Sequence, residues 1–220
     1  MRLKVRAAVL SDIPNLMEIY FVAFKNDLDR LYFPDTPQNR LCWTKELQDD
    51  IVDPDQQIQV AIDSSNGAEA IIAWAQWVCY DAEEVAVKPT YLDEQYWVEG
   101  SVAKSPEMEY ELSPDVEAST VLDYLTEQWA THARNAPRDH WYLEIIATDP
   151  NHQRRGAGSF LLEEGLIRVD KMGLEVYLEG SPMAVPLYKR FGFEEKASIT
   201  FTSPVQTRHQ IIMLREPVQE

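Results

Sequence analysis

The chain has 220 residues, of which 45% are hydrophobic, and a formal net charge of −17 that arises from 37 acidic and 20 basic residues. This length and hydrophobic content are enough for one substantial core, so a single domain of α/β type over residues 1–220 is the simplest organisation. The acidic balance argues against nonspecific binding to nucleic acid or to anionic membranes, and it favours cationic partners.

Cysteines and targeting signals narrow the class further. The two cysteines, Cys42 and Cys79, are too few for a disulfide framework, and the four histidines lack the spacing of a metal site, so no metal is expected. The first six residues carry charges where a signal peptide needs an apolar stretch, and no run approaches the ~20 apolar residues of a membrane span. We therefore expect a soluble cytoplasmic protein, and the oligomeric state is left open.

The first third of the chain predicts a strand, two helices and a hairpin. Ser11 is expected to cap the first helix, because it precedes Pro14 and an apolar run at helical spacing. Asn66-Gly67 is typical of a hairpin turn. The expected elements are a strand over 3–8, a helix after Ser11, an irregular aromatic segment over 27–37, a short helix over 40–50, and strands over 57–62 and 70–80.

Acidic residues are concentrated between residues 81 and 120, where only Lys88 and Lys104 oppose them. One interpretation is a solvated acidic loop that keeps the protein soluble. The alternative is an acidic rim that draws amines toward a site. The eleven acids are Asp81, Glu83, Glu84, Asp93, Glu94, Glu99, Glu107, Glu109, Glu111, Asp115 and Glu117.

The remainder of the chain alternates between helices and strands. Gly173 is expected to end one helix, and Pro186 must lie in the first turn of another, because a later proline would break its hydrogen bonds. The expected elements are a helix over 116–135, a strand over 141–148, a helix over 157–172, a strand over 176–179, a helix that carries Tyr188 and ends at Gly192, and a hairpin of 199–201 with 209–214 that turns at Ser203-Pro204.

The segment Gln153-Arg154-Arg155-Gly156-Ala157-Gly158 connects the 141–148 strand to the next helix. Its position places free backbone N–H groups at the positive end of a helix dipole, where a diphosphate can bind. The glycines allow close approach to the main chain, and the arginines add cationic donors. The pattern has one glycine too few for a dinucleotide fingerprint, and it lacks the Gly-Lys-Ser/Thr of a Walker loop.

This segment resembles, at every defined position, the Gln/Arg-x-x-Gly-x-Gly/Ala loop of the GNAT family of acyl-CoA-dependent N-acyltransferases. Three further segments are similar to the family in the same order: Arg6-Ala7-Ala8 with Asp12, residues 176–180, and residues 184–193 with their Gly-Phe turn. The resemblance implies the GNAT fold, a central and mostly antiparallel sheet with helices on both faces. It is thinnest over 81–118, which we expect to be an acidic variable insertion.

The resemblance also implies acetyl-CoA as the co-substrate. The sheet is expected to open where strands 141–148 and 176–179 diverge, and in the family the thioester arm of acyl-CoA lies in that opening. The family often has an asparagine after the second of these strands, and residues 179–182 of this chain contain none. The residues expected to bind the cofactor are Ile146, Ala147, Thr148, Gln153, Arg154, Arg155, Gly156, Ala157, Gly158 and Ser159.

Tyr188 is the candidate for protonating the leaving thiolate. Its position, four residues before Gly192, matches the catalytic tyrosine of the family. A phenol has a pKa near ~10, close enough to the ~8.5 of a thiol for proton transfer at modest cost. The alternative is a tyrosine whose ring packs in the core.

Glu144 is the candidate general base, because a carboxylate within the apolar strand is costly unless it faces a cleft or a partner. By strand alternation it is expected to share a face with Tyr142, Ile146 and Thr148. The alternatives are a solvent-facing or ion-paired glutamate, or a water chain as the base. Aromatic residues from irregular segments are expected to line an acceptor pocket, namely Trp43, Trp97 and Tyr32.

Three functions are consistent with these residues. The first is transfer of an acetyl group from acetyl-CoA to a primary amine, cationic and of a small molecule, by direct attack in a ternary complex. The second is a non-catalytic acyl-CoA-binding module. The third is acetylation of protein lysines or N-termini, which would need an open acidic groove instead of a closed aromatic cleft.

Overall fold

The computed structural model describes residues 3–65, 67–98, 100–105, 108–202 and 206–217. A seven-stranded sheet runs through the molecule in the order β1-β2-β3-β7-β8-β10-β9. Only the β7–β8 pair is parallel, which confirms the expected mostly antiparallel sheet. The predicted turn residues Asn66, Ser203 and Pro204 lie outside the described part. The strands are β1 (Leu3–Ala7), β2 (Gln56–Asp63), β3 (Ala70–Tyr80), β7 (His140–Thr148), β8 (Glu175–Gly180), β9 (Glu194–Thr202) and β10 (Thr207–Arg215).

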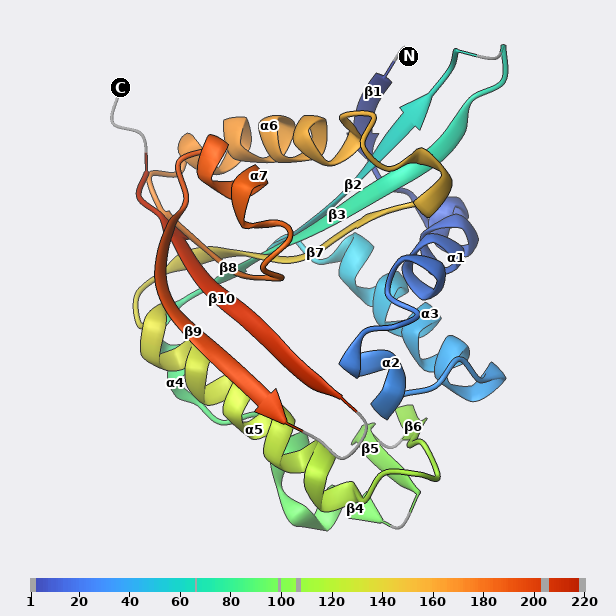
Figure 1. The fold of residues 1–220 in the computed structure, drawn as a ribbon, viewed down its shortest axis with the longest axis vertical. Helices are drawn as coiled ribbons and strands as arrows, with labels where there is room; N and C mark the ends of the chain where they lie inside the picture. The colour runs from blue at the N-terminus through green and yellow to red at the C-terminus, as the bar shows by residue number, and fades with distance from the viewer. Residues whose placement is uncertain (1–2, 66, 99, 106–107, 203–205, 218–220) are drawn as a thin grey trace.

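Helices cover both faces of this sheet, as expected (Figure 1). On one face, α6 (Ala157–Asp170) and α7 (Val185–Arg190) enclose a core around Trp77, Trp141 and Leu162. On the other face, α1 (Ile13–Ala23) and α3 (Pro37–Val52) pack against the opposite side chains of β2, β3 and β7.

Helix α6 lies unusually close to the sheet at Gly165. A Cβ atom at this position would lie 2.4 Å from Cζ2 of the buried Trp77 ring, which is closer than any real contact. A glycine is therefore required where the helix crosses β3. This contact holds α6, and with it the loop that precedes the helix, against the sheet.

The start of α1 differs from the expectation. Residues Leu10–Asp12 form a turn of 3-10 helix, and Asp12, not Ser11, occupies the cap position of α1. The carboxylate of Asp12 accepts the backbone N–H of Val9 at 2.9 Å and a guanidinium N–H of Arg6 at 2.9 Å. These contacts explain why Asp12 lies at the start of the helix. Its carboxylate forms an ion pair with Arg6 that connects β1 to the helix, which a serine hydroxyl could not form.

Two segments that were expected to be irregular contain regular structure. Residues 27–37 include the short helix α2 (Leu28–Tyr32), and the acidic stretch is an ordered insertion with a three-stranded sheet of its own. Apolar side chains from this insertion pack with α2, α3 and α5 (Ala118–Asn135), which explains why it folds and is not a solvated loop. Its elements are α4 (Ala82–Ala86), 3-10 turns at Thr90–Leu92 and Glu94–Tyr96, β4 (Trp97–Val98), β5 (Ser101–Ser105) and β6 (Met108–Glu111).

Candidate active site

The sheet opens between β7 and β8. Their parallel pairing ends at Tyr142 and Tyr177, after only three residue pairs. Beyond that point β7 continues along β3 as far as Thr148, and β8 continues along β10 as far as Gly180. The predicted divergence of these strands is therefore confirmed, and it leaves strand ends free to contact a bound molecule.

The loop after β7 has an unusual backbone. Arg154 has a φ of 59° and Gly156 a φ of 90°, both in the left-handed region, and Arg154 is the sole non-glycine residue with positive φ among the residues described. The side chain of Gln153 donates to the carbonyl of Thr148 at 3.3 Å and so closes the loop onto the end of β7. This conformation turns the chain sharply into α6.

The amino end of α6 is open to a ligand. The first helical hydrogen bond runs from the N–H of Phe160 to the carbonyl of Gly156 at 3.0 Å, so the N–H groups before Phe160 have no acceptor within the helix. Gly156 is exposed, and the side chains of Arg154 and Arg155 are exposed beside it. Backbone donors, a helix dipole and two guanidinium groups therefore converge on one surface, which fits a diphosphate.

Of the three residues at the end of β7 that are expected to bind the cofactor, two have side chains on the α6 side of the sheet. Ile146 and Thr148 lie about a van der Waals contact from the Cβ position of Gly158, at 3.9 and 4.0 Å. Ala147 is buried on the opposite face, in the core beneath α1 and α3. Alternation along the strand explains this difference, and it leaves only the backbone of Ala147 for the cofactor side.

Glu144 lies at a bulge in β7. Gln76 and Trp77 of β3 are consecutive, but they pair with Ile145 and Leu143, so Glu144 is the extra residue. Glu144 does share a face with Tyr142, since both line the same cavity. The expectation that Ile146 and Thr148 share this face is wrong, because the bulge reverses the alternation: Ile145 lines the cavity, whereas Ile146 and Thr148 lie toward α6.

Tyr188 packs on the α6 side of the opening. Its side chain is 6% exposed, and its ring meets Phe193 edge to face at 5.9 Å. The ring also lies against Gly180, where a Cβ atom would be 2.8 Å from the tyrosine Cε2. Burial raises the pKa of Tyr188 to about 12, so the hydroxyl is protonated at neutral pH.

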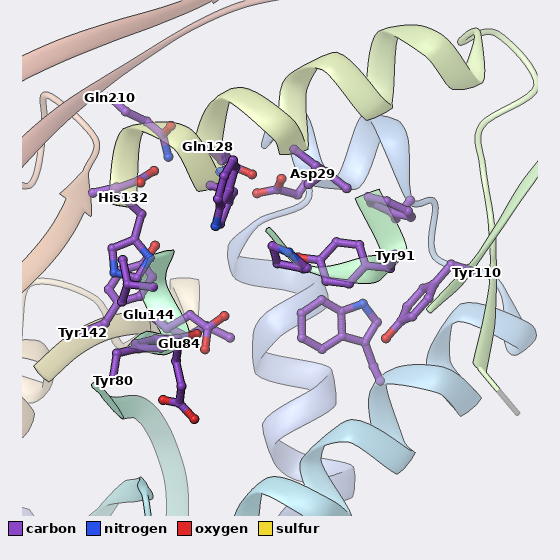
Figure 2. Close-up of a pocket in the computed structure, with 18 of the residues that line it drawn as sticks. Asp29, Tyr80, Glu84, Tyr91, Tyr110, Gln128, His132, Tyr142, Glu144 and Gln210 are labelled. Carbon is purple, nitrogen blue, oxygen red and sulfur yellow. The ribbon is translucent and has the colours of Figure 1, made fainter. Parts of the chain in front are cut away.

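A cavity of about 330 Å³ lies on the other side of the opening (Figure 2). Its walls come from α1, α2, α3, α4, α5, β3, β6, β7, β8, β10 and the 87–91 segment. In Figure 2 the side chain of Glu144 points toward the space that separates Tyr142 from Tyr91 and Tyr110. The walls combine aromatic rings with carboxylates: Tyr20, Phe33, Trp43, Tyr80, Tyr91, Tyr110, Trp129 and Tyr142, with Asp29, Glu84, Glu144 and Glu179.

The acidic insertion contributes little charge to this cavity. Of its eleven acids only Glu84 lines the cavity within the described residues, and Glu99 and Glu107 lie outside them. The insertion contributes an apolar wall instead, through Val85, Val87, Pro89 and Tyr91.

Of the three aromatic residues expected to line the acceptor pocket, Trp43 lines the cavity from within α3, whereas Tyr32 and Trp97 pack beside α5. The expected position is therefore wrong for those two.

Glu179 is a cavity residue that the sequence interpretation missed. Its carboxylate accepts a hydrogen bond from the Tyr177 hydroxyl at 2.7 Å. Burial is the main cause that raises its pKa to about 7, and the Tyr177 hydrogen bond and Arg208 oppose that increase. The sequence contains a feature that could have identified this residue, because Glu179 interrupts an apolar strand just as Glu144 does.

Arg208 is held in a network at the edge of the cavity. Its Nη1 lies 2.8 Å from Asp27 and 2.9 Å from Asp29, and it donates to the Tyr124 hydroxyl at 2.7 Å. The Tyr124 hydroxyl in turn donates to Asp29 at 2.8 Å. Two carboxylates therefore offset this cation, and the network joins β10 to α2 and α5.

A buried histidine pair lies beside the cavity. The Nε2 atoms of His132 and His140 are 2.7 Å apart, and Nδ1 of His140 lies 2.7 Å from the carbonyl of Arg138. A carbonyl only accepts, so His140 donates to Arg138 and accepts from His132. Burial, together with the neighbouring His140, lowers the pKa of His132 to about 3, and burial also lowers the pKa of His140. Both rings are therefore neutral at pH 7.

Two negative findings complete the description. Within the described residues, no group of three or more His, Cys, Asp or Glu side chains is arranged to hold a metal ion. None of the helices in the same part of the chain is long and apolar enough to cross a membrane.

Comparison with known proteins supports the family. Residues 123–193 match the sequence profile of the acetyltransferase (GNAT) family. An uncharacterized N-acetyltransferase of Schizosaccharomyces pombe is 37% identical over 84 residues, which make up 37% of this chain and 34% of that protein. The match thus spans about a third of the length of that relative. It includes no more than part of either chain, so it supports the family and not the details of a substrate.

Solved structures share the fold over nearly the whole chain. A mosquito arylalkylamine N-acetyltransferase-like protein has a TM-score of 0.61 at 15% identity and covers 98% of this chain and 100% of its own. The histone acetyltransferase HPA2 and related acetyltransferase from Corynebacterium glutamicum has a TM-score of 0.60 at 22% identity and covers 100% and 99%. The PaiA N-acetyltransferase from Thermoplasma acidophilum, in complex with coenzyme A, has a TM-score of 0.54 at 14% identity and covers 98% and 99%. The opened sheet and its loop define the GNAT fold. Residues 123–193 match the sequence profile of that family, and the chain as a whole shares the fold of these acetyltransferases.

Proposed function

We propose that this protein transfers an acetyl group from acetyl-CoA to a primary amine of a small molecule by direct attack in a ternary complex. One observation carries the proposal: an anion-binding loop and an acidic, aromatic cavity lie on opposite sides of the same opening between β7 and β8. A cofactor held by the loop would extend into the opening from one side, and an amine in the cavity would reach it from the other.

The residues of the loop would hold the cofactor. The N–H groups at the start of α6 would donate to the diphosphate, and Arg154 and Arg155 would add charge-assisted contacts. Ile146 and Thr148 lie on the same side, beside Gly158, where the arm of the cofactor would pass. Nothing lies within 4 Å of the Cβ position of Gly156, so the main chain can be approached closely.

Two side chains would serve the chemistry. Tyr188, fixed against β8 by Gly180, would donate a proton or a hydrogen bond to the departing thiolate. Its raised pKa favours hydrogen bonding over complete ionisation, because a buried tyrosinate is costly. Glu144 faces the cavity and would bind the incoming ammonium group by charge.

The size and walls of the cavity favour a small acceptor. About 330 Å³ accommodates a small molecule, and aromatic walls suit an apolar or aromatic body attached to the amine. The four carboxylates that line it outnumber the two arginines there, Arg30 and Arg208, which favours a cationic group. A protein substrate would instead need an open groove, and the insertion adds Val87, Pro89 and Tyr91 to one wall of this cavity.

A panel of amines tests this function. The panel contains small aliphatic and aromatic primary amines, lysine-containing peptides and peptides with free N-termini. Release of thiol from acetyl-CoA is followed, with mass spectrometry to detect the acetylated product and a protein-free control to subtract hydrolysis. We expect turnover with small cationic primary amines. Binding of acetyl-CoA without turnover of any amine would indicate a non-catalytic module, and turnover confined to peptides would indicate a protein acetyltransferase.

A further inference from the structure

Each of the two strands that separate at the opening of the sheet carries one carboxylate that lines the cavity. Tyr142 and Tyr177 form the last residue pair of β7 and β8. Glu144 and Glu179 each follow two residues later, on the same strand face as these tyrosines, and all but Tyr177 line the cavity. Each edge of the opening therefore carries one carboxylate, at the place where the strands begin to separate.

The two carboxylates have different surroundings. The side chain of Glu144 is exposed at the bulge, whereas Glu179 is half-buried and oriented by the hydroxyl of Tyr177 at 2.7 Å. This hydrogen bond occupies Oε1, and a carboxylate has acceptor capacity on both oxygens. Gln210 lies on the neighbouring strand β10, is 3% exposed, and lines the same cavity. Its Oε1 has no hydrogen-bond partner among the described residues.

These three side chains match the donors of a primary ammonium group. Such a group carries three N–H donors and no acceptor. Glu144, Glu179 and Gln210 line the cavity from β7, β8 and β10, and each carries an acceptor oxygen. Figure 2 shows Glu144 and Gln210 on one side of the cavity. The aromatic rings Tyr91 and Tyr110 lie on the other side. The cavity therefore has a polar end at the opening and an aromatic end away from it.

We propose, on the basis of the proposed function, that Glu179 accepts the proton that the ammonium group must lose before attack, while Glu144 and Gln210 hold the nitrogen. The ammonium N–H bond breaks and its proton forms an O–H bond on Glu179. The nitrogen lone pair then bonds to the thioester carbonyl carbon, the C–S bond breaks, and Tyr188 gives its hydroxyl proton to the thiolate. The second proton that the nitrogen loses restores the Tyr188 hydroxyl, so the products are the amide and the free thiol. Glu179 returns its proton to solvent.

The charged groups around Glu179 support this assignment. Arg208 lowers its pKa, but that cation is already paired with Asp27 and Asp29, and Asp29 acts in the opposite direction. Burial outweighs the lowering by Arg208 and by the Tyr177 hydrogen bond, so the pKa of Glu179 rises to about 7. This value is near the pH at which an amine acetyltransferase would operate. The titratable and charged groups that face it are Tyr177 on β8, Tyr142 and Glu144 on β7, Arg208 on β10, Asp29 on α2, and Tyr124 and His132 on α5.

The pH dependence of kcat/KM tests the assignment, with an amine that wild type acetylates. In wild type, kcat/KM should fall as the pH drops below about 7. In Glu179→Gln it should drop about 10²–10⁴-fold, and this acidic limb should vanish. Glu144→Gln should keep the limb and mainly raise KM. Glu163→Gln, which removes an equal charge from the exposed face of α6, should behave as wild type.

A second variant keeps the test decisive if Glu179→Gln does not fold, which thermal unfolding would reveal. Tyr177→Phe removes the hydrogen bond that stabilises the charged carboxylate, so the acidic limb should move to higher pH. Three results would each overturn the assignment of Glu179. The acidic limb of kcat/KM could stay in place in Tyr177→Phe, persist in a folded Glu179→Gln, or disappear in Glu144→Gln. A wild-type protein that acetylates no amine would overturn the proposed function, and this assignment with it.

Discussion

The two sides of the opening between β7 and β8 are built in different ways. On the α6 side, a continuous segment from Thr148 to Ser159 supplies backbone donors and two arginines, all near the surface. On the other side, the cavity takes its walls from many segments spread from Tyr20 to Gln210. The first side presents main-chain groups and positive charge. The second presents side chains and negative charge.

This difference follows from what each side is proposed to bind. Coenzyme A is the same molecule for every member of such a family, so a local backbone conformation is a sufficient solution for its diphosphate. An acceptor amine must be distinguished from other amines, which requires shape and charge from many elements at once. The two sides should therefore respond separately to mutation, and the following predictions test that separation in order of decreasing effect.

Tyr188 lies where the two sides meet, and its removal should give the largest effect on the rate. Tyr188→Phe deletes one oxygen and keeps the ring that packs on Gly180 and Phe193. We expect kcat to fall about 10²–10⁴-fold while the Kd for acetyl-CoA, measured by calorimetry, stays near wild type. Tyr96→Phe in the insertion is the control. Full activity in Tyr188→Phe would assign this residue to packing alone.

The loop should control the cofactor and nothing else. Reversal of Arg154 and Arg155 to glutamate replaces attraction to the diphosphate by repulsion, and the exposed position allows the change without loss of fold. We expect the Kd for acetyl-CoA to rise by roughly 10²–10⁴-fold, since two charge-assisted contacts of about 1.5–3 kcal/mol each would be lost. Arg168→Glu, in the last turn of α6, controls for net charge. Equal affinity in the double variant would place the diphosphate elsewhere.

The packing of α6 should affect stability instead of binding chemistry. In Gly165→Ala the new Cβ atom would lie 2.4 Å from the Trp77 ring, so the helix must move away from the sheet. We expect the free energy of unfolding, from denaturant titration, to fall by about 1–3 kcal/mol. Gly173→Asn, at a left-handed position with open space around it, is a control in which the loss should be smaller. An unchanged stability in Gly165→Ala would contradict the close contact.

The histidine pair makes the acceptor side sensitive to acid. The pKa of His132 is about 3 in the folded protein and near 6.5 in an unfolded chain, so the unfolded state binds more protons below pH 6.5. The stabilisation is complete above pH 6.5 and is lost as the pH falls toward 3. By pH 5 the loss from this residue should be about 2 kcal/mol.

The raised pKa of Glu179 makes stability change with pH in the opposite direction. It stabilises the fold at low pH, and this stabilisation is lost as the pH rises through about 7. The wild-type stability curve therefore partly hides the contribution of His132. The informative quantity is the stability difference between wild type and His132→Asn. We expect this difference to shrink by about 2 kcal/mol from pH 7 to pH 5, and a constant difference would mean that His132 titrates normally.

The smallest effect should come from the acidic insertion. Glu84 lines the cavity, and its neighbour Glu83 on the same helix does not. Glu84→Gln should raise the KM for a cationic amine about two- to fivefold at low salt, and less at high salt, because exposed charges are screened. Glu83→Gln should change KM less. Equal effects of the two variants would indicate a general acidic surface and not a local contact.

The success of the sequence interpretation also differs between the two sides. The loop, the start of α6 and the divergence of the strands were predicted because they depend on glycines, a helix start and apolar periodicity over a short span. The cavity was predicted poorly. Glu179 was overlooked, the bulge at Glu144 was not expected, and Tyr32 and Trp97 were placed in a pocket that they do not line.

The physical reason lies in the range of the interactions. A helix terminus, a left-handed glycine and a strand are decided by residues within a few positions of one another, so the sequence by itself determined the opened sheet and the loop before α6. The pKa of Glu179, the side of the sheet that Ile146 faces, and the enclosure of the cavity by the insertion depend on contacts between segments up to about 180 residues apart. Only the tertiary structure decided these features, because burial and charge at one position are set by whichever distant side chains pack around it.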